Sequence, residues 1–303
     1  MNRINHPRSP IWFGGCSEGA PLHDADDMMH YLKSVTELPT LSPVAMRVVG
    51  MLLNTETTAR ELAQVIEKDP AMVSKLLKLV NSSFYGFSSR ISSVIHAIMI
   101  LGFNTVLNAV LSMSVMDAFK IRTYKRRGID LTRLWHHAIG VAVVAKHLGR
   151  CMGGDNDNAF TAGILHDIGK IVMAIFFSER FVEMQRSDDA RQGDFLRAEE
   201  HYFPIGHASL GAFLADQWKL PDELTTVIAQ HHQHDKPCGN IVTLVQTADA
   251  IVNIHVENNG TEEKWPICNA ARDLMQDKIG ATNQWLTEVG REIRASCEAM
   301  LEV

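Results

Sequence analysis

The stretch that decides the fold is Phe160-Thr-Ala-Gly-Ile-Leu-His166-Asp167-Ile-Gly-Lys170-Ile-Val-Met-Ala-Ile-Phe-Phe177. Its apolar residues continue over a length that predicts a buried helix. An imidazole and a carboxylate stand side by side in the middle of this run. Burying such a pair costs several kcal/mol unless something pairs with it. Either a metal ion or a hydrogen-bonded pair within the core would offset that cost.

Composition restricts the class of protein. The 303 residues suffice for one large domain or two modest ones. With 46% hydrophobic and 21% charged residues, the chain has an ordinary globular composition. A net charge of −6 and a pI near 6.1 argue against a broad nucleic-acid-binding surface. Five cysteines without CxxC spacing indicate reduced thiols in a cytoplasmic protein.

Two segments bear on targeting. Residues 1–27 lack the apolar core of a signal peptide, and we expect them to form a flexible tail. The stretch Ala97–Met116 is long and nearly uncharged, so a membrane span has to be considered. It contains Gly102, Asn104 and Asn108, which favour buried helices of a globular protein. We therefore expect neither a membrane nor a nucleic acid as a partner.

Helix-start signals recur through the first half of the chain. A capping residue is followed by proline at two positions, and a capping box occurs between them. These signals are Ser42-Pro43, Thr58-x-x-Glu61 and Asp69-Pro70. Gly102 then interrupts a long apolar stretch. Because no alternating strand pattern of any length occurs, the sequence predicts an all-α fold.

In the second half, five successive helical stretches place an imidazole or a carboxylate among inward-facing apolar residues. A single histidine on an apolar face is usually a hydrogen-bonded core residue, but ten of the fourteen histidines lie between positions 136 and 255. A shared polar centre explains this clustering better than independent accidents do. Histidine with carboxylate is the ligand chemistry of transition metals. The inward-facing residues are His137, His166 with Asp167, His207, His231 and Asp249.

Neighbouring residues refine this hypothesis. His231 and His232 are adjacent on a predicted helix, so their side chains should diverge by about 100° and should not ligate one ion in the same way. Two metals, or one metal and a substrate contact, fit better. Asp167 is able to bridge two ions. Lys170 lies on the same side of the predicted helix as His166, where it either binds a phosphate oxygen or pairs with Asp167.

The pattern His137…His166-Asp167…Asp249 resembles the H…HD…D signature of the HD phosphohydrolase superfamily, whose fold is a helical bundle around one or two metals. His207, His231 and His232 match the additional histidines of its dinuclear members, which include the HD-GYP phosphodiesterases. Further stretches are similar to the HDOD domain, and the resemblance covers roughly residues 31–255. They include Leu38-Pro39-x-Leu41-x-Pro43, Asp69-Pro70-Ala71, Leu101-Gly102 and Trp218-x-Leu220-Pro221.

The resemblance implies an architecture. An N-terminal helical part (28–120) would pack on an HD-type bundle (121–256), and a C-terminal helical extension (257–303) would follow. The residues after His232 lack the Asp-Gly-x-Gly-Tyr-Pro loop of HD-GYP proteins. Arg133 stands where trinuclear HD-GYP members have glutamate, so we do not expect a third metal.

The resemblance also implies a metal site. A mixed nitrogen and oxygen set without cysteine suits two divalent ions of iron or manganese, with zinc as an alternative. If the site is active, Asp167 and Lys170 are its expected catalytic residues. The expected metal ligands are His137, His166, Asp167, His207, His231, His232 and Asp249.

Three functions fit these observations. The first is a regulatory HDOD protein in bacterial signal transduction, whose pocket binds metal and a nucleotide-type ligand or a signalling protein partner without turnover. The second is a metal-dependent phosphohydrolase, since dinuclear sites of this kind activate water for phosphate-ester hydrolysis. The third is a metal-free interaction scaffold in which the inward histidines satisfy one another.

Overall fold

The computed structural model describes residues 24–34, 38–52, 54, 56–81, 89–119, 129–151, 157–191, 193–233, 240–253 and 283–301. Most of the expected N-terminal tail, residues 1–23, lies outside these ranges. So do residues 257–282 of the expected C-terminal extension.

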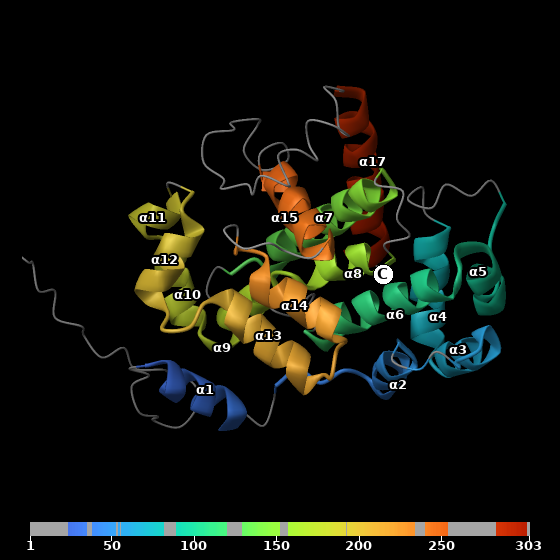
Figure 1. Ribbon diagram of the computed structural model, residues 1–303, viewed down its shortest axis with the longest axis horizontal. Coiled ribbons are helices and arrows are strands. Elements are labelled where there is room, and N and C mark those ends of the chain that lie inside the picture. Colours follow the sequence, from blue (N-terminus) through green and yellow to red (C-terminus); the bar gives the residue numbers. More distant parts are fainter. Residues whose placement is uncertain are drawn as a thin grey trace, which may run out of the picture.

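Helices make up the regular elements of the described residues, with no β-strand among them, so the all-α prediction is confirmed (Figure 1). The first, α1, packs against the bundle through Tyr31, whose ring lies 5.5 Å from that of Phe177. Five further helices form the rest of the N-terminal half. These six helices are α1 (Ala25–Ser34), α2 (Pro43–Leu52), α3 (Ala59–Ile66), α4 (Pro70–Val80), α5 (Val94–Leu101) and α6 (Phe103–Ala118).

Local signals place the helix boundaries in this half. Thr58 and Glu61 form the predicted capping box at the start of α3. The Asp69 carboxylate accepts hydrogen bonds from two backbone N–H groups at the start of α4. Gly102, at φ 92°, separates α5 from α6. The stretch Ala97–Met116 is therefore divided between two helices, and α6 is buried from Val106 to Met116.

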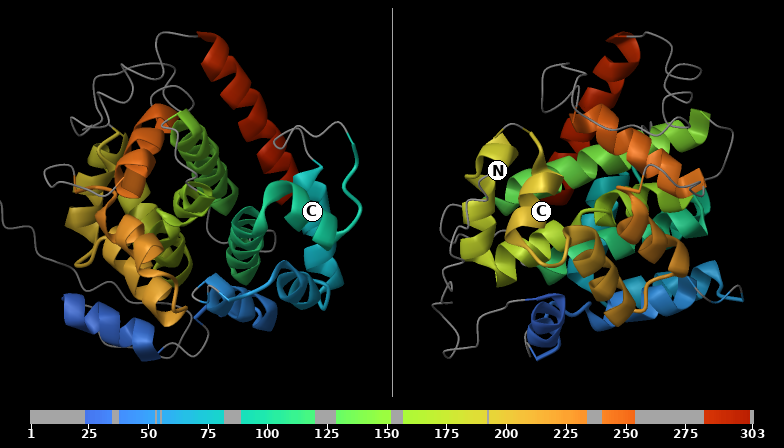
Figure 2. Two further views of the ribbon diagram at one scale, coloured as in Figure 1. Left: turned by 45° about the vertical axis from the view of Figure 1, so that its right-hand side comes forward. Right: turned by 60° about the vertical axis from the view of Figure 1, so that its left-hand side comes forward.

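The second half is a bundle built around α7. This helix packs against α8, α15 and α17, and α9 packs against α13. Figure 2 shows α17 reaching from the bundle to the N-terminal half, where it contacts α4. The helices are α7 (Leu131–Cys151), α8 (Asp157–Leu165), α9 (Ile168–Phe176), α10 (Ser178–Gln185), α11 (Asp188–Arg191), α12 (Phe195–Tyr202), α13 (His207–Gln217), α14 (Asp222–Gln230), α15 (Asn240–Ile251) and α17 (Asn283–Leu301).

The expected single helix around His166 and Asp167 is wrong. Helix α8 ends at Leu165, α9 begins at Ile168, and the two residues form the turn between them. Asp167, at φ −101° and ψ 15°, is the N-cap residue of α9. Apolar residues on both sides of the turn are buried, so hydrophobic periodicity continues across it and conceals the break.

One described helical stretch, Asn158–Phe176, which combines α8 and α9, would be long and apolar enough to cross a membrane by length and composition. Most of it, 83%, is buried inside the protein.

Helices α9 and α13 approach each other closely at a glycine. A Cβ atom on Gly169 would lie 1.8 Å from the backbone oxygen of His207 and 2.8 Å from the backbone nitrogen of Gly211. Backbone atoms cannot move aside as the end of a flexible side chain can. Glycine at 169 is therefore required for the contact that brings the start of α13 next to Asp167.

We expect Gly169→Ala to lower the free energy of unfolding by about 3 kcal/mol, because the added methyl group forces α9 and α13 apart. The control is Gly290→Ala in α17, where the nearest atom to the new Cβ would be Arg294 Nη1 at 3.8 Å. That substitution should stabilise the protein by about 0.5–1 kcal/mol. Urea unfolding of both variants measures the difference, and equal midpoints would contradict the packing argument.

Candidate metal centre

Every predicted metal-ligating residue lies at one centre of the bundle. They come from five elements: α7, the turn between α8 and α9 with two of them, the first residue of α13, the end of α14 with two more, and α15. Five of them are buried, and His137 and His232 are half-buried. They are His137, His166, Asp167, His207, His231, His232 and Asp249.

The two oxygen atoms of the Asp167 carboxylate face different imidazoles. Oδ1 lies 3.2 Å from Nε2 of His207 and 3.4 Å from Nε2 of His231. Oδ2 lies 3.4 Å from Nε2 of His166 and 3.6 Å from Nε2 of His137. Asp167 therefore belongs to two groups of ligand atoms at once.

The remaining two residues extend these groups. Nε2 of His232 lies 3.1 Å from Nε2 of His207, on the Oδ1 side of Asp167. Asp249 Oδ1 lies 3.1 Å from Nε2 of His137, on the other side. A hydrogen bond of 2.7 Å from the Asn253 amide orients that same Asp249 oxygen.

Backbone carbonyl groups fix the tautomers of two of the histidines. His166 Nδ1 donates to the carbonyl oxygen of Gly163 at 2.7 Å, and His231 Nδ1 donates to that of Ile228 at 2.9 Å. A carbonyl oxygen only accepts, so each Nδ1 carries the proton. Nε2 of the neutral ring then presents a lone pair to the centre, which is the form that binds a metal.

Glu199 on α12 orients His207. Its Oε2 accepts a hydrogen bond of 2.6 Å from His207 Nδ1, and its Oε1 accepts one of 2.9 Å from the His207 backbone N–H. Sequence reasoning missed this buried carboxylate. Glu200 stands next to it and is exposed, so the local sequence gives no sign of which glutamate faces inward. The sequence offers one hint: Phe195 is apolar and lies one turn before Glu199, so both residues share the face of the helix that turns inward.

The donor set fits a cation. His207 Nε2 and His231 Nε2 lie 3.2 Å apart, and both rings are protonated on the far nitrogen. Facing lone pairs repel unless a proton or a metal ion lies between them. Within the described residues, His166 Nε2 and Asp167 Oδ1 are also buried without a hydrogen bond. Buried polar atoms without a partner are costly, and bound divalent ions would pair with these atoms.

The protonation states match those of metal ligands. Burial lowers the pKa of His231 to about 4 and also lowers the pKa of His232. Although burial opposes ionisation, the Lys170 ammonium group at 2.6 Å holds the pKa of Asp167 well below its ordinary range. At neutral pH these imidazoles are neutral and the carboxylate is charged, so a metal displaces few protons from these groups when it binds.

Comparison with known proteins identifies the family. The model of the HDOD domain matches residues 38–234. The chain belongs to the HDOD domain family. An HDOD domain protein of unknown function from Geobacter sulfurreducens is 25% identical, with a TM-score of 0.73 over 90% of this chain and 96% of that one.

Two further relatives are more distant. A protein from Shewanella amazonensis, assigned as a phosphohydrolase, shares the fold at 21% identity, with a TM-score of 0.67 over 92% of this chain and 97% of that one. Ribonuclease Y of Aliarcobacter butzleri is 24% identical over 246 residues, 80% of this chain and 41% of the relative. The HDOD chain thus spans less than half the length of this curated relative.

The expected divergence of His231 and His232 is wrong. Their ring centroids are 4.0 Å apart in the HDOD structure, and both Nε2 atoms lie near Nε2 of His207. Helix α14 ends at Gln230, so His231 is its C-cap and His232 lies beyond it. The 100° step between neighbours holds only inside a helix.

Lys170 makes the predicted ion pair. Its Nζ lies 2.6 Å from Asp167 Oδ2 and 4.8 Å from the centroid of the Phe195 ring. Of the two roles expected for this lysine in the HDOD site, pairing with Asp167 is the one confirmed. Binding of a phosphate oxygen stays a prediction.

We expect the metal-free protein to lose stability as the pH falls from about 6.5 to about 4. His231 is neutral in the folded state down to a pKa of about 4, against an ordinary value of 6.5. The unfolded chain therefore binds a proton in this window that the folded chain does not, which lowers the free energy of unfolding by about 3 kcal/mol.

Urea unfolding across this pH range measures the effect. The His231→Gln variant should lose about half of the pH dependence, because His232, whose pKa burial also lowers, contributes the rest, whereas His201→Gln, at an exposed position of α12, should retain it. An unchanged pH dependence in His231→Gln would contradict the prediction.

Proposed function

We propose that this chain is a regulatory HDOD protein whose centre holds two divalent ions and, through them, binds a phosphate-bearing ligand. The observation that carries the proposal is the division of the Asp167 carboxylate, with each oxygen directed at a separate group of imidazoles. A carboxylate bridges two ions in this way, and an imidazole does not. Iron or manganese suits the mixed nitrogen and oxygen ligands, and zinc is the alternative.

Each ion has its own ligand set. The first would be bound by Asp167 Oδ1 and the imidazoles of His207, His231 and His232, whose ligand atoms lie within 4.8 Å of one another. The second would be bound by Asp167 Oδ2, His137 and His166, which form a similar group, and by Asp249 beside His137.

Two features support binding without turnover. The side chains of His166 and His207 have no exposed surface, so a bulky substrate has little access to the imidazoles. The Lys170 side chain is 17% exposed, and it is already neutralised by Asp167. A phosphate-bearing ligand, such as a nucleotide, would compete with Asp167 for this lysine and would bring its own negative charge to the ions. A protein partner would then respond to the liganded state.

Hydrolysis of a phosphate ester is the second candidate. Two relatives favour it, namely ribonuclease Y and the Shewanella protein assigned as a phosphohydrolase. Two bound ions would supply Lewis-acid activation of water and of the phosphate oxygen. Among the protein groups, Asp167 would bridge the two ions and Lys170 would bind a phosphate oxygen.

We expect the purified protein to contain two equivalents of metal, or to take them up when it is reconstituted. His232→Gln should lose about one equivalent from the first group, and Asp249→Asn about one from the second. Asp167→Asn should lose both, because its carboxylate serves both groups. Elemental analysis measures these contents, with Asp216→Asn, an exposed position of α13, as the control. A metal content near zero in the wild type, unchanged by reconstitution, would contradict the proposal. It would favour the third function considered above, a metal-free interaction scaffold.

A second experiment separates binding from catalysis. With Fe(II) or Mn(II) supplied anaerobically, we expect no appreciable hydrolysis of a generic phosphodiester or of cyclic dinucleotides. Inorganic phosphate should nevertheless bind to the metal-loaded protein in calorimetry. Hydrolysis that Asp167→Ala abolishes and Asp216→Asn preserves would overturn the binding-only function and establish the phosphohydrolase.

A further inference from the structure

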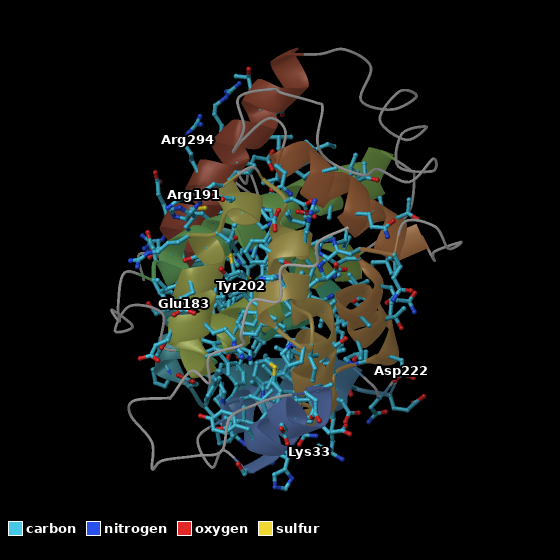
Figure 3. All side chains as sticks on the ribbon, turned by 90° about the vertical axis from the view of Figure 1, so that its left-hand side faces the viewer. Lys33, Glu183, Arg191, Tyr202, Asp222 and Arg294 are labelled. Carbon is cyan, nitrogen blue, oxygen red and sulfur yellow. The ribbon has the colours of Figure 1, made fainter. Side chains whose placement is uncertain are left out.

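Helix α12 reaches the metal centre with two side chains one helical turn apart, Phe195 and Glu199. Sequence reasoning expected neither of them there. Helix α12 contacts α10 and α11, and these three helices form one group. In Figure 3 the group can be found by its labelled residues Glu183, Arg191 and Tyr202. Glu199 makes two hydrogen bonds to a candidate ligand, His207.

We propose that Glu199 is a positioning residue of the metal centre, which selects the tautomer of His207 that presents a bare Nε2 to the first ion. The proposal rests on the metal-binding function proposed above. Its basis is that one carboxylate accepts from both donors of the same residue, the ring Nδ1 at 2.6 Å and the backbone N–H at 2.9 Å.

The two hydrogen bonds require a carboxylate. A carboxylate has two acceptor oxygens and no donor, whereas an amide of the same shape has one acceptor and one donor group. Both oxygens of Glu199 accept, so the proton of the ring lies on Nδ1 and Nε2 is the nitrogen left to ligate an ion. With glutamine at 199, its NH₂ group would face one of the two donors. The ring relieves this clash by moving its proton to Nε2, which blocks that nitrogen as a ligand.

The surroundings hold the Glu199 carboxylate in place. A Cβ atom on Gly206 would lie 2.6 Å from Glu199 Oε1, so glycine at 206 leaves room for this oxygen. Gly206 is the N-cap of α13 and has no side chain to cap the helix, and Glu199 supplies the missing acceptor. Phe195 adds a second restraint, because its ring packs edge-on against that of His207 at 6.3 Å.

The group that orients the His207 ring differs from the groups that orient two other candidate ligands. Neutral carbonyl oxygens within their own chain segments orient His166 and His231. His207 instead depends on a charged group from a separate helix. A carboxylate behind an imidazole increases the electron density at the ligating nitrogen and fixes the ring, and loss of such a partner typically costs about 10–100-fold in metal affinity.

The test compares Glu199→Gln with Glu200→Gln, which makes the same chemical change at the adjacent exposed position. Competition with a chelator measures the affinity for Mn(II) and Zn(II). We expect the affinity of Glu199→Gln to fall about 10–100-fold, and that of Glu200→Gln to match the wild type. A role in capping α13 alone would lower stability without changing the tautomer, so nitrogen NMR of the assigned His207 ring is recorded on the Zn(II)-saturated proteins.

The NMR measurement gives the result that a structural role would not produce. We expect Nδ1 protonated and Nε2 bound to the metal in the wild type and in Glu200→Gln, and a shift towards protonated Nε2 in Glu199→Gln. Equal affinity and an unchanged tautomer in Glu199→Gln would overturn the proposal. If Glu199→Gln does not fold, the wild-type spectrum decides, because a proton on Nε2 of His207 there would overturn it.

The same experiment distinguishes this proposal from the function on which it rests. A wild type that binds no metal, with Nδ1 of His207 protonated, would contradict the metal-binding function and leave the positioning role of Glu199 supported. A wild type that binds two ions with an affinity independent of Glu199 would support the function and contradict the positioning role.

Discussion

The rest of the structure depends on the burial of one carboxylate, that of Asp167, among imidazoles. Its exposed fraction is only 6%, and its two oxygens face nitrogen atoms from four different elements of the bundle. Lys170 neutralises one oxygen at 2.6 Å. The other oxygen faces the Nε2 atoms of His207 and His231. Such an arrangement of acceptors is stable only with additional positive charge, which is why the bundle is best understood as a site built for cations.

Glycines let the helices of the bundle approach one another closely on both sides of the turn that carries Asp167. A Cβ atom on Gly163 would lie 2.5 Å from Cα of Ala142, so glycine lets α8 lie against α7 just before the turn that carries His166. Gly169 does the same for α9 and α13 on the other side of that turn. On its outer side, α8 meets α6 through polar contacts, including one of 3.3 Å between Thr161 and Ser112. The N-terminal half therefore touches the helix that leads directly into the centre.

Much of the centre could be predicted because its imidazoles and carboxylates stand in apolar surroundings. An imidazole such as His207 or a carboxylate such as Asp249, placed on the inner face of a helix, needs a partner wherever the helix packs. The predictions that failed concern local geometry. The break between α8 and α9 is hidden by buried residues on both sides, and the end of α14 at Gln230 places His232 beside His231 instead of a third of a turn away.

The sequence by itself determined the helical fold, its capped boundaries and which imidazoles and carboxylates face inward, because capping and amphipathic periodicity act over a few residues. Only the tertiary structure decided which Asp167 oxygen faces which imidazoles, and that Glu199, not Glu200, supports His207. These facts depend on how separate helices pack, to within a fraction of an ångström. Periodicity specifies which face of a helix is buried, but not the atom that it meets there.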